Sequence, residues 1–347
     1  MLQFKQFIKS ILLMVRLPFF KIFSTTFFLS AFFYSIFSRA FWREFNSVLM
    51  GRYLYLKRLH EKSENVFLLR RNVHRLEKGL LMRPRRPVFG LKYIEELVNT
   101  YERLVSKDLE NDESIGGQLI WARDVLTKYF SVVENNMIVS KCRNQFEKID
   151  IAFGSKGKKI PFNQLSKEPP VQYDHFFKLT KNRRSVRWYL PKPVPREMID
   201  RAILAAVQSP SSCNRLPYEF RVIDDEKMVK EVSTIPMGTK GFADNIPVII
   251  AVVGHLDAFF HERDRHLIYI DASLASMAMV LSFETMGLST CCLNWPDIPK
   301  REKKIIKVLN LERKDRVIMF IAVGWADPEG KVAYSEKKPL GVIRKYN

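Results

Sequence analysis

The sequence predicts a layered domain of strands and helices, either α+β or α/β, behind a mainly helical N-terminal half. From about residue 172, short apolar runs typical of strands alternate with amphipathic helical stretches. Residues 61–160 instead carry apolar positions at helical spacing. A chain of 347 residues is long for one core and fits two domains. We expect a hydrophobic basic segment over 1–60, a helical region and linker over 61–170, and the layered domain over 171–347.

The first 60 residues are rich in Phe, Leu and Ile and are interrupted by Lys and Arg. Their longest uncharged run covers residues 22–38, at the lower edge of what spans a bilayer. The small-residue cleavage site of a signal peptide is not evident. Three interpretations stay open: a helix lying on an anionic membrane surface, which we favour, a helix buried against the protein or a partner, and a short transmembrane anchor.

The segment from 61 to 170 contains two helical patterns, over residues 91–105 and 119–133. Residues 72–80 are dense in ionisable side chains. We favour a solvated helix end that Gly79 caps over a binding site at this place. Residues 154–170, with their lysines and paired prolines, are typical of a linker.

Four strands are expected in the C-terminal half, over residues 218–223, 247–253, 288–293 and 317–323. One helix is expected to end at Asn182, a second to begin near Pro195, and a long one to cover 264–286 before Gly287. The small side chains of residues 271–278 allow close helix packing, so the long helix is expected to be central, with a place at a subunit interface open.

The formal charge of +20 suggests an anionic partner, which could be a phosphate ligand, a membrane surface or nucleic acid. Roughly +13 of it lies in residues 1–86. A well-solvated basic surface is the alternative. No nucleic-acid motif accompanies the charge, so we expect no nucleic-acid partner. The four cysteines form no CxxC pair and fit a reducing compartment, and the scattered histidines predict no metal site.

A basic run reads Arg183, Arg184, Ser185, Val186 and Arg187. A phosphate monoester is bound well by guanidinium groups and a hydroxyl close together, and this run can supply them. Basic clusters are common on surfaces, so the run alone indicates only a candidate phosphate site.

A polar loop is expected at residues 209–217, between a helix and a strand. It holds Pro210, Ser211, Ser212, Cys213 and Asn214. Such side chains can face the polar edge of a heteroaromatic ring, although an ordinary turn has the same composition.

A third polar patch is the pair Lys337 and Lys338 near the C-terminus. A lysine there could contact a phosphate or offset the negative charge of a reduced flavin. A solvated tail is the alternative.

These patches, in this order, resemble the nitroreductase family of FMN enzymes. That family's pattern R-[RH]-S-[VTI]-[RK]-x-[FY], followed by P-[VI]-P, is matched by residues 183–189 and 193–195. Its pattern [AS]-P-S-x-x-N-x-Q-P-[WY]-x-F is matched by 209–220, except that Leu216 replaces Gln. A G-L-[GS]-T-C segment after the long helix is matched by 287–291. The resemblance covers residues 172–347.

The resemblance implies an α+β fold, with a central, mostly antiparallel sheet flanked by helices, in a domain-swapped homodimer with FMN at each subunit interface. It also implies roles for particular side chains. The ribityl phosphate would be held by Arg183, Arg184, Ser185 and Arg187. The flavin ring would be approached by Pro210, Ser211, Ser212 and Asn214, with Asn214 on its pyrimidine edge; the first three could serve the flavin shared with the partner subunit. Asn294 and Trp295 would pass by the ring, and Lys337 or Lys338 would lie near the phosphate.

The implied activity is two-electron transfer from NADH or NADPH through FMN to an unknown acceptor. No catalytic side chain is assigned, since the cofactor carries this chemistry. Leu216 and the Asn294-Trp295-Pro296 segment depart from the family pattern, which leaves the substrate and reductant open. The alternatives are an FMN-dependent oxidase or dehydrogenase acting on a biosynthetic intermediate, and a non-enzymatic membrane-associated scaffold.

A surface-polysaccharide precursor is one such intermediate. Longer proteins that resemble nitroreductases and carry an extension resembling residues 74–80 are associated with bacterial genes for surface polysaccharides. We expect a cytoplasmic location, with peripheral attachment to the inner membrane as the alternative.

Overall fold

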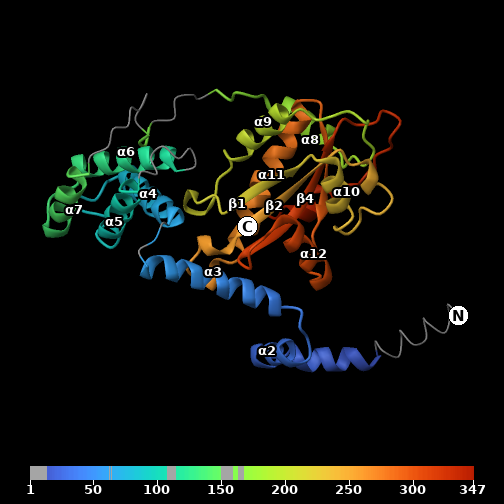
Figure 1. The fold of residues 1–347 in the computed structure, drawn as a ribbon, viewed down its shortest axis with the longest axis horizontal. Helices are drawn as coiled ribbons and strands as arrows, with labels where there is room; N and C mark the ends of the chain where they lie inside the picture. The colour runs from blue at the N-terminus through green and yellow to red at the C-terminus, as the bar shows by residue number, and fades with distance from the viewer. Residues whose placement is uncertain (1–13, 62, 64, 108–114, 150–158, 163–167) are drawn as a thin grey trace.

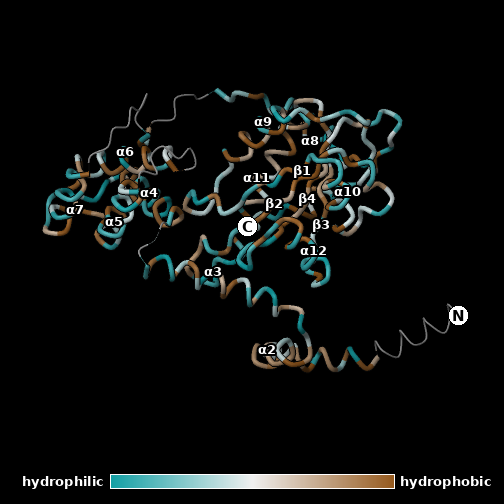
Figure 2. Tube along the Cα trace, in the orientation of Figure 1, coloured by the Kyte–Doolittle hydropathy of each residue, from teal (hydrophilic) through white to brown (hydrophobic). Residues whose placement is uncertain are grey.

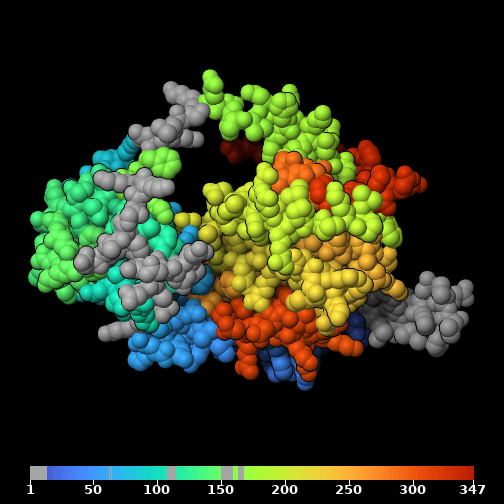
Figure 3. Space-filling view, turned by 45° about the horizontal axis from the view of Figure 1, so that its top comes forward, coloured from blue at the N-terminus to red at the C-terminus, as the bar shows by residue number. Residues whose placement is uncertain are grey.

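The computed structural model describes residues 14–61, 63, 65–107, 115–149, 159–162 and 168–347. A group of helices lies beside a layered domain, and an N-terminal helical hairpin extends from beneath them (Figure 1). The space-filling view shows the helical group and the layered domain as two lobes side by side (Figure 3). Most of the linker expected at 154–170 lies outside the described residues.

The described residues of the layered domain form a four-stranded antiparallel sheet in the order β1-β2-β4-β3. Its strands are β1 (Tyr218–Ile223), β2 (Val248–His255), β3 (Ser289–Asn294) and β4 (Asp315–Gly324). All four expected strands are therefore present, and the α+β fold class is confirmed.

Helices cover both faces of this sheet. On one face α9 (Arg196–Ala206) and α11 (Leu267–Thr285) share an apolar cluster with Ile250 and Ile321. On the other face α10 (Glu226–Ser233) and α12 (Pro299–Leu309) pack against Ile249 and Phe320. The continuous apolar run of β2 follows from this burial on both sides.

The long helix α11 is central, as the small-residue stretch predicts. Ala272, Ala275 and Ser276 are buried against the sheet and α9. Gly287 follows the helix with φ of +77°, a conformation that glycine adopts easily. Among the described residues, 262–285 is the one helical stretch long and apolar enough to cross a membrane, but its packing is that of a core helix.

The helical group has its own apolar core. It consists of α4 (Val66–Leu81), α5 (Ile94–Val105), α6 (Gly116–Val132) and α7 (Met137–Glu147). Side-chain caps start two of these helices: Asn65 accepts a hydrogen bond from Leu68 N, and Asn136 accepts from Ile138 N and Val139 N. The expected helices at 91–105 and 119–133 correspond to α5 and α6.

The interpretation of residues 72–80 as a solvated helix end is wrong. Asn72 is fully buried within α4, and the helix continues to Leu81. Gly79 is not a cap but lies inside the helix against Phe89, where a Cβ would come within 2.3 Å of the ring. The side chain is absent because two segments pack closely there, a reason that local sequence does not show.

Helix α3 (Trp42–His60) lies on the layered domain. Its arginines pair with carboxylates of that domain: Arg43 with Asp297, Arg52 with Glu262, and Arg58 with Asp257 at 2.7 Å. Gly51 permits the approach, since a Cβ would lie 2.7 Å from the backbone of Leu256. The interpretation of a helix buried against the protein therefore describes α3.

The residues before α3 form a helical hairpin. Residues 14–23 are helical, a turn follows at 24–26, and α2 (Phe27–Ile36) runs back along the first arm. Phe19 and Phe23 meet Phe33 and Phe37 at ring-centroid distances of 5.6–5.9 Å. Thr26 caps α2 by accepting from Leu29 N. The uncharged run at 22–38 is thus broken, and α2, about 15 Å long, is too short for a transmembrane anchor.

The remaining described elements are short. They comprise α8 (Tyr173–Asn182), α13 (Leu340–Ile343) and the 3-10 turns η2 (Ser212–Asn214), η3 (Ala243–Asn245), η4 (Leu256–Ala258) and η5 (Glu262–Asp264). Helix α8 ends at Asn182 as expected, and it delivers the chain to the basic run.

Candidate functional site

The basic run lies along the free edge of β3. After α8 the chain becomes extended, Ser185 bridges Thr290 in parallel, and Val186 N donates to Thr290 O at 3.0 Å. Buried Tyr189 anchors the run by donating its hydroxyl to Val186 O at 2.7 Å. Val186 is buried, whereas Arg183 and Ser185 are half-buried and Arg187 is exposed.

These three side chains gather around Cys291. Burial raises the pKa of the Cys291 thiol, while the charges of Arg187 and Arg183 and a hydrogen bond with Ser185 oppose that rise. Among the described residues, neither Arg183 nor Arg187 forms a close ion pair, although the charge of Arg183 acts on the Glu284 carboxylate and lowers its pKa against the effect of burial. Arg187 lies over the Phe242 ring at 5.8 Å. Two guanidinium groups and a hydroxyl therefore stand together without a close ion pair.

Arg184 points elsewhere. Its Nη1 donates to the carbonyl oxygens of Lys181 and Arg183, at the C-terminal end of α8. Cationic groups stabilise helix C-termini, so this side chain has a local structural partner. The structure brings together three of the four residues predicted to hold the phosphate.

The segment after β3 is divided between surface and core. Asn294 is exposed on the same side of the strand as Cys292. Trp295 is 8% exposed, donates its Nε1–H to Glu302 at 2.9 Å, and packs edge-on against Phe320. Asn294 is available to a ligand at the surface, whereas Trp295 belongs to the core beneath it.

The polar loop lies at the opposite corner of the sheet. The loop leads into β1. Tyr218 of β1 pairs with Gly254 of β2, which in turn pairs with Arg316 of β4. Thr290 of β3, beside the basic run, pairs instead with Val323 of β4. These two positions on β4 are seven residues apart, a span of about 23 Å, and the loop and the run also lie at opposite edges of the sheet. One chain therefore does not bring the run and the loop together.

The loop is held in a strained shape. Cys213, Asn214 and Leu216 have φ values of 53°, 52° and 50°, a region that side chains other than glycine adopt at a cost of about 1–3 kcal/mol each. Hydrogen bonds fix it: Ser212 N donates to Asp271 at 2.9 Å, and Leu216 N donates to the Ser211 hydroxyl at 3.1 Å.

Helix α4 contacts the other side of the loop. Arg70 Nε donates to the carbonyl oxygen of Asn214 at 2.5 Å. The helical group therefore fixes a loop of the layered domain. Pro210 precedes the turn, and Lys337 and Lys338 are exposed in the tail before α13.

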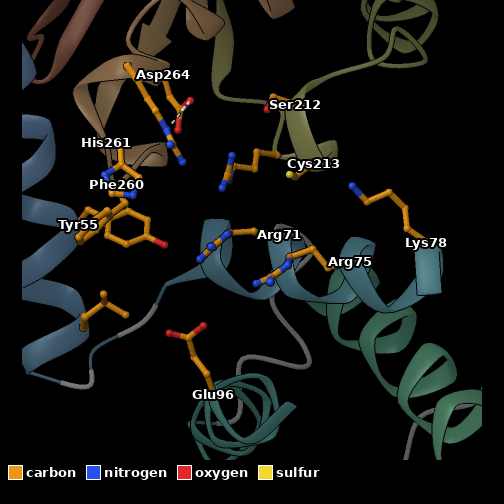
Figure 4. A pocket seen from close by; sticks show the side chains of 13 residues that line it. Tyr55, Arg71, Arg75, Lys78, Glu96, Ser212, Cys213, Phe260, His261 and Asp264 are labelled. Atoms are coloured by element: carbon orange, nitrogen blue, oxygen red, sulfur yellow. Dashed lines mark ion pairs between the residues drawn. The ribbon is translucent and has the colours of Figure 1, made fainter. Parts of the chain in front are cut away.

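A cavity of about 590 Å³ opens between α4 and this loop. Arg71, Arg75 and Lys78 enter it from α4, and Ser212 and Cys213 face them from the loop (Figure 4). Its remaining lining residues are Tyr55, Leu59, Glu96, Arg215, Phe260, His261, Arg263 and Asp264. Of the predicted site residues only Ser212 lines this cavity. The three cations of α4 were not predicted as site residues from the sequence, although their spacing of four and three residues places them on one helix face.

The layered α+β domain carries a basic run at one corner and a strained polar loop at the other, and two overlapping segments of it match a family of oxidoreductases. Residues 180–239 and 225–325 match the Nitroreductase family. The iodotyrosine deiodinase of Danio rerio is 36% identical over 211 residues, 50% of this chain and 70% of that protein. The chain belongs to the nitroreductase family, which confirms the predicted resemblance.

Other relatives are more distant. Iodotyrosine deiodinase 1 of Sus scrofa is 25% identical over 215 residues, which cover 53% of this chain and 73% of that protein. Among solved structures, an FMN-dependent nitroreductase from Clostridium difficile R20291 is 26% identical, with a TM-score of 0.40, over 46% of this chain and 92% of that one. The family match begins at residue 180, after the helical group.

Proposed function

We propose that the protein is an FMN-dependent oxidoreductase that passes two electrons from NADH or NADPH to a small-molecule acceptor. The observation that carries this proposal is the cluster of Arg183, Ser185 and Arg187 at the edge of β3, in which neither arginine forms a close ion pair among the described residues. Bound FMN would supply the hydride chemistry. The side chains would bind it and compensate its charge.

The residues fit a phosphorylated flavin. Arg183, Ser185 and Arg187 would bind the phosphate by charge-assisted hydrogen bonds, and Asn294 would lie beside the ring. Arg184, which caps α8, would act mainly by positioning the run. Lys337 or Lys338 would approach the phosphate from the tail, and Trp295 would support Asn294 from the core.

A second copy of the chain would complete the site. Pro210, Ser211, Ser212 and Asn214 lie at the far corner of the sheet from the run, so a second copy is the natural source of these groups. An exposed apolar stripe on α11 supports such a contact, formed by Ile270, Leu274 and Met277 with exposures of 52%, 46% and 45%. The proposal is therefore a homodimer with two shared flavin sites.

Two acceptor classes are worth testing first. Relatives are named iodotyrosine deiodinases, and a protein of Methanothermobacter thermautotrophicus that is 30% identical over 109 residues is named "Putative NADH dehydrogenase/NAD(P)H nitroreductase". An aryl iodide consumes two electrons and a proton to give the arene and iodide, and a nitroarene is also reduced by electron pairs.

Flavin that neither NADH nor NADPH reduces under anaerobic conditions would favour the oxidase alternative. Protein that neither carries nor binds FMN would favour the scaffold alternative.

The phosphate assignment predicts which arginines retain the flavin. The double variant Arg183→Ala/Arg187→Ala loses two charge-assisted contacts, each with a typical contribution of about 1.5–3 kcal/mol, so it should purify with little flavin. Absorbance spectra and mass analysis of the released cofactor measure occupancy. Arg85→Ala/Arg313→Ala, which removes two exposed arginines elsewhere, should retain it. Full occupancy in the first double variant would refute the assignment.

The hairpin supports a second proposal, peripheral attachment to an anionic membrane surface. Phe27 and Phe28 are 98% and 76% exposed, and Figure 2 shows the hydrophobic character of this segment. Lys21 and Arg39 flank the aromatic residues. Exposed aromatic side chains beside cations are typical of helices that lie in the membrane interface.

A further inference from the structure

Three cations of α4 face the layered domain. Arg71, Arg75 and Lys78 follow one another at intervals of four and three residues, while Leu69, Val73 and Leu76 are buried in the helical core on the other side. Like charges at this spacing weaken a helix by about 0.2–0.5 kcal/mol per pair. Figure 4 shows all three side chains on the cavity wall that α4 forms. Arg75 also lies over the Tyr93 ring at 3.7 Å and donates to Asn72 Oδ1 at 3.3 Å. A ligand of opposite charge would relieve this repulsion.

The opposite wall contributes a buried cation. Arg215 is 8% exposed, lines the cavity and lies over the Phe259 ring at 4.7 Å. Its Nε has no hydrogen-bond partner among the described residues, and no carboxylate there lies within ion-pair distance. Burial lowers its pKa, which reflects an incompletely compensated charge. Buried charges are costly without a close partner, and Asp264 and Asp271 act on Arg215 through their charges without forming an ion pair with it.

The carboxylates of the cavity do not balance these groups. Five cationic side chains line it against two acidic ones, Glu96 and Asp264. Glu96 already accepts a hydrogen bond from Asn72 at 2.8 Å, and Asp264 lies 4.0 Å from Arg263. The cavity therefore carries an excess of three positive charges, derived as five minus two from its lining residues.

The size and the aromatic lining of the cavity set a second requirement for its ligand. The volume of about 590 Å³ suits a ligand of drug-like size rather than a single ion. Tyr55 and Phe260 form one side, with ring centroids 5.7 Å apart, and their labelled rings face the arginines in Figure 4. A ligand that fits both features has an anionic group at one end and a ring at the other.

We propose that this cavity binds a small molecule carrying a diphosphate and a ring, such as a nucleoside diphosphate. Arg71 and Arg75 would bind the phosphate oxygens from α4, and Arg215 would bind them from the loop. Guanidinium forks from two walls match the several oxygens of a diphosphate better than the two of a single carboxylate. The ring would pack against Phe260. This site is separate from the proposed flavin-phosphate run on β3. Four of its lining residues come from the helical group, two from α3 and seven from the layered domain, among them Ser212 of the polar loop.

Calorimetric titration of the purified full-length protein tests this proposal, with inorganic pyrophosphate and ADP as the probes. Both should bind, and ADP should bind more tightly because it adds a ring. Arg71→Ala/Arg75→Ala should weaken both affinities at least about tenfold, the effect of losing one charge-assisted hydrogen bond. The matched control Arg201→Ala/Arg313→Ala removes two exposed arginines outside the cavity and should bind like the parent protein.

Several results would overturn the inference. One is absence of binding at millimolar probe, and another is equal affinity in the two double variants. ADP binding no tighter than pyrophosphate would remove the ring from the proposal. Loss of bound flavin from Arg71→Ala/Arg75→Ala would make the cavity part of the cofactor site instead. If the alanine variant does not fold, Arg71→Gln/Arg75→Gln keeps the helical side-chain stems and gives the same readout.

Discussion

Asp315, at the start of β4, shows how a single side chain joins several segments of the layered domain. It is buried, lies 2.9 Å from His255 Nδ1 and accepts a hydrogen bond from Glu312 N at 2.9 Å. Lys314 lies 3.1 Å from it and also approaches Asp257, the partner of Arg58 on α3. Burial would raise the pKa of Asp315, but the hydrogen bonds from His255 and Glu312 and the Lys314 charge together hold that pKa at about 2.

The depressed pKa gives a prediction about stability and pH. The ionised carboxylate of Asp315 is favoured in the folded state, so its stabilisation is present above the ordinary value of 3.8 and is lost as pH falls toward 2. The difference between these values corresponds to about 2 kcal/mol. Asp315→Asn should lower the free energy of unfolding by that amount at pH 7 and by progressively less between pH 4 and 2.

Urea unfolding at several pH values measures this difference. The exposed carboxylate Asp200 provides the matched control, because Asp200→Asn should change little at any pH. A difference between the parent protein and Asp315→Asn that stays constant from pH 7 to pH 2 would contradict the electrostatic explanation.

At the scale of elements, α3 and the hairpin before it have opposite surroundings despite similar composition. Arg43, Arg52 and Arg58 attach α3 to the layered domain through ion pairs. The hairpin instead exposes Phe27 and Phe28. Burial against the protein explains α3, and the exposed aromatic surface of the hairpin is the part that still lacks a partner.

The hairpin proposal predicts binding to anionic vesicles. The parent protein should float with vesicles of phosphatidylcholine and phosphatidylglycerol, and less with phosphatidylcholine alone, because cations flank the aromatic residues. Phe27→Glu/Phe28→Glu should reduce binding about tenfold or more, since it removes apolar contact and adds negative charge. Met137→Glu, at an 86% exposed position of α7, is the control and should float normally. Equal flotation of the parent and the double variant would exclude this surface.

At the scale of the whole molecule, the flavin proposal depends on a second copy. The basic run and the polar loop occupy opposite corners of one sheet, and α11 presents apolar side chains on its outer face. Exposed stripes of this kind usually mark interfaces. The helical group then has a separate role, because it fixes the loop through Arg70 and forms one wall of the basic cavity.

The dimer proposal predicts a mass of twice 40.7 kDa in solution. Leu274→Glu places a charge in the centre of the exposed α11 stripe and should produce a monomer that also loses flavin, because the shared site is then incomplete. Light scattering after size exclusion and the flavin absorbance measure both effects. Leu81→Glu, at a 54% exposed position of α4, should remain dimeric and yellow. A Leu274→Glu variant that stays dimeric would place the interface elsewhere.

The sequence by itself determined the elements whose signals are local. Periodicity predicted β1 and the long α11, because burial repeats with the pitch of a helix or the pleat of a strand. The order of the motifs predicted the family. Helices α10 and α12 were not predicted, although Asp225 at a cap and Pro299 at a first turn are local signals for them.

Only the tertiary structure decided which distant residues meet. Strand register separated the run of Arg183 from the loop of Asn214, and lobe packing placed Arg71 and Arg75 opposite Arg215. Close packing against Phe89 explains the glycine at position 79, whereas the usual role of glycine at a helix end does not. The physical reason is that periodicity records burial along one element, whereas contacts between elements depend on how whole surfaces fit and on charges far apart in the chain.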